Sequence, residues 1–276
     1  MSQEYGPDTE RLLQTLATCG DTLDLEGYNL TSLPPLPSSL KHLYCDKTHI
    51  THLPDLPRCL ETLQCARTRI TELPELPPTL TVAYCHTTRI THLPPLPPSL
   101  DILYCNNTHI TELPDLPLTL RALHCADTHI TSLPPLPSSL QDLYCERTRI
   151  SHLPSLPSSL RTLDCSQTRV TTLPELPSTL YMLGCNYLQI TELPELPSNL
   201  GRLDCHTTPL ILQRDWNESL KDYKARWAIW REEKGSKQRI QERARGIHED
   251  LVANVWHPRR VAQLIELGGY DLLDTL

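Results

Sequence analysis

Cysteine is the residue type in this chain most able to carry chemistry, and its spacing is regular. Nine of the eleven cysteines recur at every twentieth position from Cys45 to Cys205. Zinc sites need ligands that converge tetrahedrally, usually from closely spaced pairs, whereas these thiols would lie in one row, about 5 Å apart on neighbouring strands. Parallel Cβ vectors also fit disulfide geometry poorly. We therefore interpret the row as small buried hydrophobic side chains, whose reduced state predicts an intracellular setting.

Cys59 and a pair of histidines are the other chemical candidates. Cys59 stands where other repeats have Ser or Thr, so it is either an exposed thiol or a tolerated substitution. His49 and His52 lie in one repeat at a separation that suits a metal, but the next repeat has Arg69 and Glu72 in their places. Such variation favours solvated surface positions. We predict no metal site and no cofactor.

Motifs of the common enzyme classes are missing from the sequence. It contains no Gly-rich phosphate loop, no H-E-x-x-H and no serine nucleophile elbow. No apolar run approaches the roughly 18–20 residues of a membrane helix, and a formal net charge of −8 argues against binding a nucleic-acid backbone. The N-terminus lacks the layout of a classical signal peptide. We expect a protein with no catalytic residues that binds neither nucleic acid nor membranes.

The 20-residue period also defines the structural elements. Within the repeat 41–60, Leu43 and Cys45 alternate with polar residues, as in a short strand with one buried face. The Leu-Pro-x-Leu-Pro segment that follows cannot be helical, because each proline removes a donor and fixes φ. Repeats this short bury their leucines only by stacking. The pattern predicts an α/β repeat solenoid with a parallel β-sheet on the concave face and extended, polyproline-II convex arms.

The repeat resembles the leucine-rich repeat, L-x-x-L-x-L-x-x-N-x-L, with Cys in the third apolar position and Thr in the Asn position. Its Leu-Pro-x-Leu-Pro doublet is similar to the short class that includes the leucine-rich domains of YopM/IpaH-type bacterial effectors, over about 23–210. Some of these relatives carry a ubiquitin-ligase domain with a nucleophilic cysteine after the repeats. Here no cysteine follows Cys205, so ligase activity is not expected.

Three regions are predicted: an N-terminal helical cap over 1–20, the solenoid over 21–212, and a helical C-terminal segment over 213–276. Leucines at helical spacing between Pro7 and Thr18 indicate the cap, with Asp8 or Thr9 as N-cap. In the C-terminal segment, Gly235 is predicted to end a first helix, a second would run over 237–255, and His257-Pro258 would open a third.

Equivalent residues of the stacked repeats form columns, named here after their member in the repeat 41–60. The Thr48 column occupies the Asn position of the family and is expected to form a hydrogen-bonded ladder between repeats. Leu188 interrupts that column, which puts regular packing there in doubt.

The Tyr44 column faces the inner curve and is the candidate partner-binding surface. Tyrosine supplies a large rigid contact area with a polar tip; alternatively, the rings only stabilise the sheet by stacking. The candidate residues are Tyr44, Tyr84, Tyr104, His124 and Tyr144.

The His49 column carries a basic or protonatable residue in seven successive repeats. We name it the basic stripe: His49, Arg69, Arg89, His109, His129, Arg149 and Arg169. It could bind an acidic protein surface through Arg–carboxylate pairing. The alternative is local pairing, for example of Arg69 with Glu72, which contributes little.

Together these features predict a non-enzymatic protein–protein interaction module, effector-like in its repeats, that binds a protein partner on the tyrosine-lined concave face. The alternative is a structural or assembly component that docks through its C-terminal helices. The stretch around His257-Pro258-Arg259-Arg260 and Gly268-Gly269 is similar to C-terminal stretches in large DNA virus proteins. That resemblance implies a viral protein of the host cytoplasm or the virion.

Overall fold

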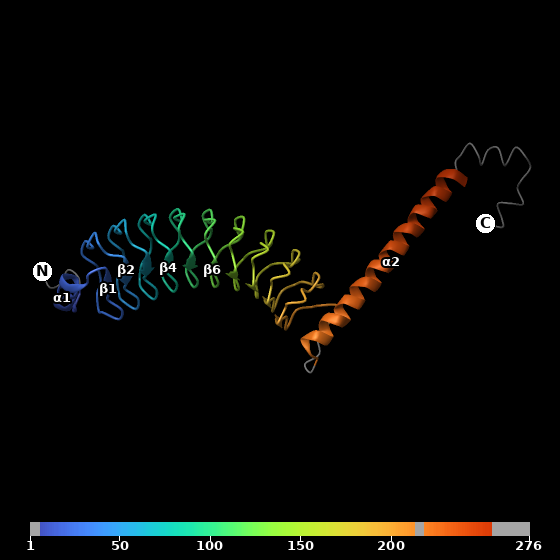
Figure 1. Ribbon diagram of the computed structural model, residues 1–276. Coiled ribbons are helices and arrows are strands. Elements are labelled where there is room, and N and C mark those ends of the chain that lie inside the picture. Colours follow the sequence, from blue (N-terminus) through green and yellow to red (C-terminus); the bar gives the residue numbers. More distant parts are fainter. Residues whose placement is uncertain (1–5, 213–217, 256–276) are drawn as a thin grey trace, which may run out of the picture. The chain divides into compact units, whose positions relative to one another are not determined.

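The computed structural model describes residues 6–212 and 218–255, and the chain divides into two compact units, Met1–Trp216 and Asn217–Leu276. The first unit is a solenoid and the second contains one long helix (Figure 1).

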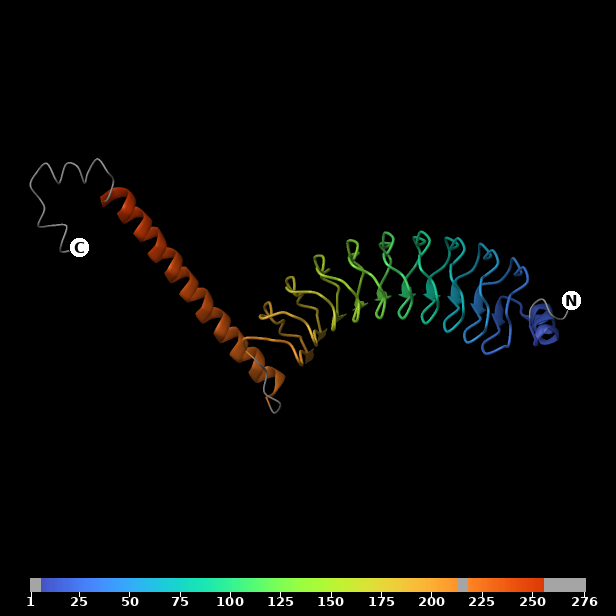
Figure 2. The same cartoon turned by 180° about the vertical axis from the view of Figure 1, so that it is seen from behind.

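Ten three-residue strands form one parallel sheet in which each strand pairs with its sequence neighbours. Every pairing joins residue i to residue i+20, as in Leu43 with Leu63. The sheet lies on the concave side of the solenoid, and the arms fan out on the other side (Figures 1 and 2). This confirms the predicted fold. The strands are β1 Thr22–Asp24, β2 His42–Tyr44, β3 Thr62–Gln64, β4 Val82–Tyr84, β5 Ile102–Tyr104, β6 Ala122–His124, β7 Asp142–Tyr144, β8 Thr162–Asp164, β9 Met182–Gly184 and β10 Arg202–Asp204.

The solenoid core consists of repeated apolar columns. Leu43, Cys45, Ile50 and Leu60 have no exposed surface, and their equivalents are buried along the stack. A fully buried Leu or Ile contributes about 1.5–3 kcal/mol to stability. Eight of the nine cysteines in the row are buried and Cys205, in the last coil, is half-buried; all are free thiols.

Hydrogen bonds outside the strands also join each coil to the next. The Cys45 N–H donates to the Gln64 carbonyl at 2.8 Å, and the Lys47 N–H donates to the Ala66 carbonyl at 3.0 Å. On the arm, the Thr79 hydroxyl lies 2.8 Å from the carbonyl oxygens of both Arg58 and Leu60.

Cys59 takes the place of a hydroxyl in this arm column. Its Sγ lies 3.0 Å from the Ser38 carbonyl and 3.2 Å from the Leu40 carbonyl, the equivalents of the two acceptors of Thr79. The side chain is half-buried. The interpretation as a tolerated substitution is therefore confirmed.

The predicted ladder of threonines between coils is wrong. The Thr48 hydroxyl donates to the Cys45 carbonyl of its own coil at 2.8 Å, and the same bond recurs along the column. The tight turn brings the carbonyl three residues back within hydrogen-bond distance of the hydroxyl. A regular row of hydroxyl groups that bridge coils is found in the Cys59 column instead.

Leu188 changes this pattern without interrupting the sheet. Its side chain is fully buried, and β9 still pairs with both neighbours. The Cys185 carbonyl, which receives no hydroxyl from position 188, accepts one at 2.8 Å from Thr208 of the next coil.

A left-handed turn residue follows each strand. The Lys47 column has φ between 53° and 57° in nine coils, and Gly27 occupies the same position in the first coil at 72°. None of the nine is glycine, although this conformation costs a non-glycine L-residue roughly 1–2 kcal/mol.

Helix α1, Thr9–Thr18, covers the first coil. Leu12 is fully buried, whereas Leu13 is exposed. Asp8, one of the two predicted candidates, is the N-cap residue, but its carboxylate makes no capping hydrogen bond to the helix. It accepts the Asn29 N–H at 2.7 Å and so joins the cap to the solenoid.

Helix α2, Leu220–Val255, is continuous, so the predicted helix end at Gly235 is wrong. Glycine inside a helix costs only about 1 kcal/mol relative to alanine, which the strong helix formers around it offset. In the described chain, no helix is long and apolar enough to cross a membrane. The third predicted helix, from His257-Pro258, lies outside the described residues.

We predict that thiol labelling of the native protein is confined to Cys19, Cys59 and Cys205, the three cysteines that are half-buried. Burial raises the pKa of Cys85 to about 12, so little reactive thiolate forms there at pH 8. Mass spectrometry after brief iodoacetamide treatment measures the pattern, and labelling in guanidinium should reach all eleven. Rapid modification of most of the row in the native state would contradict the assignment of faces.

We also predict that Thr87→Gly raises the free energy of unfolding by about 1 kcal/mol, because glycine relieves the strain of φ 57°. Thr111→Gly is the matched control. Thr111 is exposed and is not among the residues with positive φ, so glycine there should destabilise by about 0.5–1 kcal/mol. Thermal unfolding by circular dichroism measures both, and shifts of the same sign would contradict the strain argument.

Candidate binding surface

Four rings of the Tyr44 column form a continuous stack on the concave face. Ring centroids are 4.7 Å apart for Tyr84 and Tyr104, 3.8 Å for Tyr104 and His124, and 4.3 Å for His124 and Tyr144. The strands impose this contact, because parallel in-register pairing places equivalent side chains about 4.8 Å apart. We call Tyr84, Tyr104, His124 and Tyr144 the ring stack. The expected stacking is present, and each of the four residues is half-buried.

Burial shifts the pKa values of His124, Tyr104 and Tyr144 in the direction that favours their neutral forms. Loss of solvent lowers the pKa of His124, against the opposing effect of Asp142. The imidazole is therefore neutral at pH 7 and stacks between phenol rings without a buried charge. Burial also raises the pKa of Tyr104 and of Tyr144. The stack is an uncharged aromatic surface at neutral pH.

Small apolar side chains widen this surface along one side. Val82, Ile102 and Ala122 precede the ring residues on β4, β5 and β6, and all three are half-buried. An aromatic and aliphatic patch thus covers three adjacent strands at the centre of the concave face. Such a patch resembles the apolar centre of protein interfaces.

Carboxylates bound the patch on its C-terminal side. Asp142 and Tyr144 share β7, Glu146 follows that strand, and Asp164 ends β8. Burial raises the pKa of Glu146, with further contributions from Asp164 and Asp127. Among the described residues, its Oε2 is enclosed without a hydrogen-bond partner. We call Asp142, Glu146 and Asp164 the acidic end.

Asp164 follows the last ring of the column, Tyr144, and Gly184 follows Asp164. A Cβ at that position would lie 2.5 Å from the Asp164 carboxylate, which occupies the space above the glycine. The same carboxylate accepts the Ser166 N–H at 3.0 Å. The absence of a side chain at 184 thus fixes the acidic end next to the ring stack.

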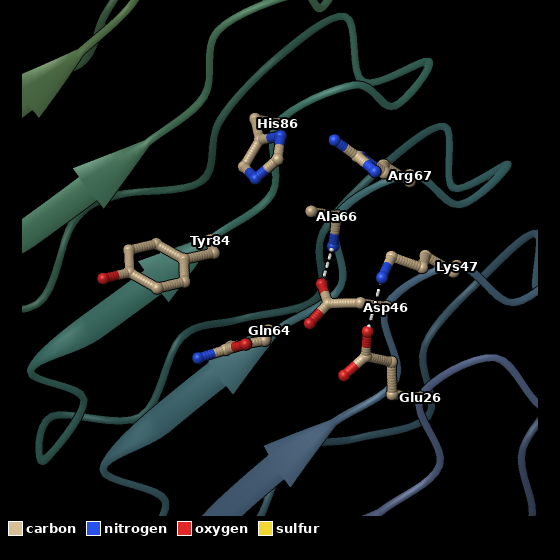
Figure 3. A pocket seen from close by; sticks show the side chains of 8 residues that line it. All are labelled: Glu26, Asp46, Lys47, Gln64, Ala66, Arg67, Tyr84 and His86. Carbon is tan, nitrogen blue, oxygen red and sulfur yellow. Dashed lines mark hydrogen bonds and ion pairs between the residues drawn. The ribbon is translucent and has the colours of Figure 1, made fainter.

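Tyr44 lies apart from the ring stack, because Gln64 stands between it and Tyr84 in the column. A hollow of about 270 Å³ lies here, where Asp46 accepts the Ala66 N–H at 2.6 Å and Lys47 pairs with Glu26 at 2.7 Å. Figure 3 shows Tyr84 and Gln64 on neighbouring strands and His86 and Arg67 above them. Burial lowers the pKa of His86, and Arg67 lowers it further.

The basic stripe lies on the turn beyond the concave face, and all seven of its residues are exposed. The alternative of local pairing is wrong for Arg69: among the described residues, its guanidinium forms no ion pair, with Glu72 or any other acid. His109 and His129 stack with centroids 6.0 Å apart.

Metal-ligating side chains do not cluster in residues 6–212 or in the described part of α2. No group of three His, Cys, Asp or Glu residues converges there to hold a metal. His52 contacts the neighbouring Thr51 hydroxyl at 3.1 Å rather than His49.

Sequence reasoning placed the ring column correctly but did not recognise the acidic end as a feature. Glu146 lies in a column where other coils have Asp46, His86 and Asn106. Comparing two columns across adjacent coils, rather than one at a time, would have brought it together with Asp142 and Asp164. No residue pattern in the sequence indicates the hollow beside Gln64.

Comparisons with known proteins support the repeat assignment at the level of structure. No protein-family model matches the chain, and no curated protein does. YopM from Yersinia enterocolitica WA-314 is 32% identical with a TM-score of 0.58, over 70% of this chain and 52% of that one. This chain therefore spans about half the length of YopM.

Two further solved structures share the solenoid. A Shigella effector leucine-rich repeat domain is 30% identical with a TM-score of 0.56, over 59% of this chain and 78% of the domain. The functional domain of InlJ from Listeria monocytogenes, which includes a cysteine ladder, is 22% identical with a TM-score of 0.53, over 71% of this chain and 55% of that one, and supports the fold alone. The repeat, the parallel sheet and these similarities show that the chain belongs to the leucine-rich repeat family, with a solenoid like those of bacterial effector domains.

Proposed function

We propose that this protein is a non-enzymatic binding module that holds a protein partner on its concave face. The observation that carries the proposal is the ring stack, an uncharged aromatic surface across four adjacent strands. Aromatic side chains held rigid by their neighbours lose little conformational entropy on binding, which is why they are enriched in interfaces.

The patch offers both parts of a protein-binding site. Its centre, with Val82, Ile102 and the rings, suits apolar side chains of the partner. The acidic end supplies the half-buried carboxylates of Asp142 and Asp164, which suit hydrogen-bond donors of the partner. Membership of the leucine-rich repeat family supports a binding role, and the row of free thiols suits a reducing compartment.

A photo-cross-linking experiment tests the proposed face. A benzophenone amino acid replaces either Tyr104, at the centre of the ring stack, or Leu118, which is 80% exposed on the outer arm. Cross-linking in lysate should give a discrete protein adduct from position 104 and not from position 118. The cross-linked protein is then purified for direct measurement of affinity.

We predict that Tyr84→Ala with Tyr104→Ala weakens the affinity for that partner at least about tenfold, because truncating a central interface aromatic costs more than about 1 kcal/mol. Tyr181→Ala with Tyr187→Ala is the matched control, since both tyrosines are more than half exposed and lie outside the ring stack. Calorimetric titration measures both variants after circular dichroism has verified their fold. Unchanged affinity in the first variant, or equal losses in both, would refute the concave-face proposal.

A further inference from the structure

The backbone of the basic stripe forms its own row of hydrogen bonds between successive coils, which we call the stripe ladder. The N–H of each stripe residue donates to the carbonyl of the residue 19 positions earlier, from His49 to Leu30 at 2.9 Å through to Arg169 to Ile150 at 2.8 Å. In the described chain this ladder stops there, since no such bond joins Gln189 to Val170. The stripe and the ladder therefore coincide. At about 4.8 Å for each coil, the seven positions span roughly 29 Å.

The arginines of this ladder are not used to hold the solenoid together. Among the described residues of the solenoid unit, five basic side chains form ion pairs, and none of them belongs to the stripe; they are Lys41, Lys47, Arg121, Arg147 and Arg202. Within the described residues, the four stripe arginines form no ion pair and no side-chain hydrogen bond, and all are exposed. Their donors are available to a partner.

The order of residues divides the stripe into two arginine pairs. Arg69 and Arg89 lie on adjacent coils, as do Arg149 and Arg169, and the stacked rings of His109 and His129 separate the pairs. Three coil steps, about 14 Å, separate the inner members Arg89 and Arg149. Two clusters of positive charge at a fixed separation thus lie on a protein whose net charge is −8.

We propose that the basic stripe is a second docking edge, distinct from the concave face, that binds an acidic segment of a protein partner. Guanidinium groups pair with carboxylates through two parallel hydrogen bonds, and each arginine pair offers adjacent positions for such bonds. The exposed column beside the stripe consists of Thr and Ser, such as Thr71 and Thr91. Neither this column nor the stripe contains a Phe, Tyr or Trp ring on which a nucleic-acid base could stack, which favours a polypeptide.

The test compares two variants of the full chain with equal charge. The stripe variant carries Arg69→Gln, Arg89→Gln, Arg149→Gln and Arg169→Gln. The control variant carries Arg58→Gln, Arg121→Gln, Arg161→Gln and Arg202→Gln, at exposed arginines outside the stripe. The probe is a fluorescein-labelled deca-glutamate peptide, and its binding is measured by fluorescence anisotropy at low salt. Deca-glutamine is the uncharged reference, and a ten-nucleotide oligothymidine is the nucleic-acid competitor.

The proposal predicts that deca-glutamate binds the unmodified protein, that the stripe variant binds it at least about tenfold more weakly, and that the control variant stays within about twofold. Added salt should weaken the binding. Failure of the peptide to bind, similar affinities of the two variants, or equal binding of deca-glutamine would overturn the proposal. Oligothymidine that binds as tightly as deca-glutamate would assign the edge to nucleic acid instead. None of these results bears on the ring stack, so this proposal and the concave-face proposal can fail separately.

Discussion

The solenoid depends on one constraint, which is that paired groups lie one coil apart along the chain. The strand pairing, the Lys47-column turn bonds, the stripe ladder and the arm hydroxyls all join groups offset by 19 to 21 residues. An insertion of one residue in a coil would misalign the bonds of that coil to its neighbours, and within a strand it would turn buried side chains outward. Because the offset never varies, side chains of one column stay in register over the whole stack, and both proposed binding surfaces follow from that register.

The left-handed turn at the Lys47 column separates those two surfaces. On one side of it the rings stack on the concave strands, and on the other side the arginines stand on their own ladder. One turn geometry, repeated in each coil, therefore keeps an uncharged aromatic face and a cationic edge apart. The two surfaces suit different chemistry: apolar and donor groups on the concave face, and carboxylates on the edge.

The sequence predicted the features that depend on periodicity and not those that depend on local distances. Strands such as His42–Tyr44, the dry Leu and Cys columns and the ring column follow from spacing alone. The acceptor of the Thr48 hydroxyl depends on which carbonyl the turn brings closest, and no column pattern encodes that. Helix α2 continues through Gly235 because the helix propensities of the surrounding residues offset the small cost of one glycine. The enclosed oxygen of Glu146 depends on how side chains from several coils pack.

Leu188 has a mechanical consequence for the stack. Between the coils 161–180 and 181–200 the stripe ladder is missing, and the threonine hydroxyl that bonds the Cys185 carbonyl comes from the coil beyond. Backbone hydrogen bonds outside the strands are therefore fewer by one at this boundary than at the boundaries further toward the N-terminus. A force along the solenoid axis acts equally on every boundary between coils, so we expect the boundary with the fewest backbone hydrogen bonds to separate first. The ring stack and the basic stripe of the earlier coils would then stay intact.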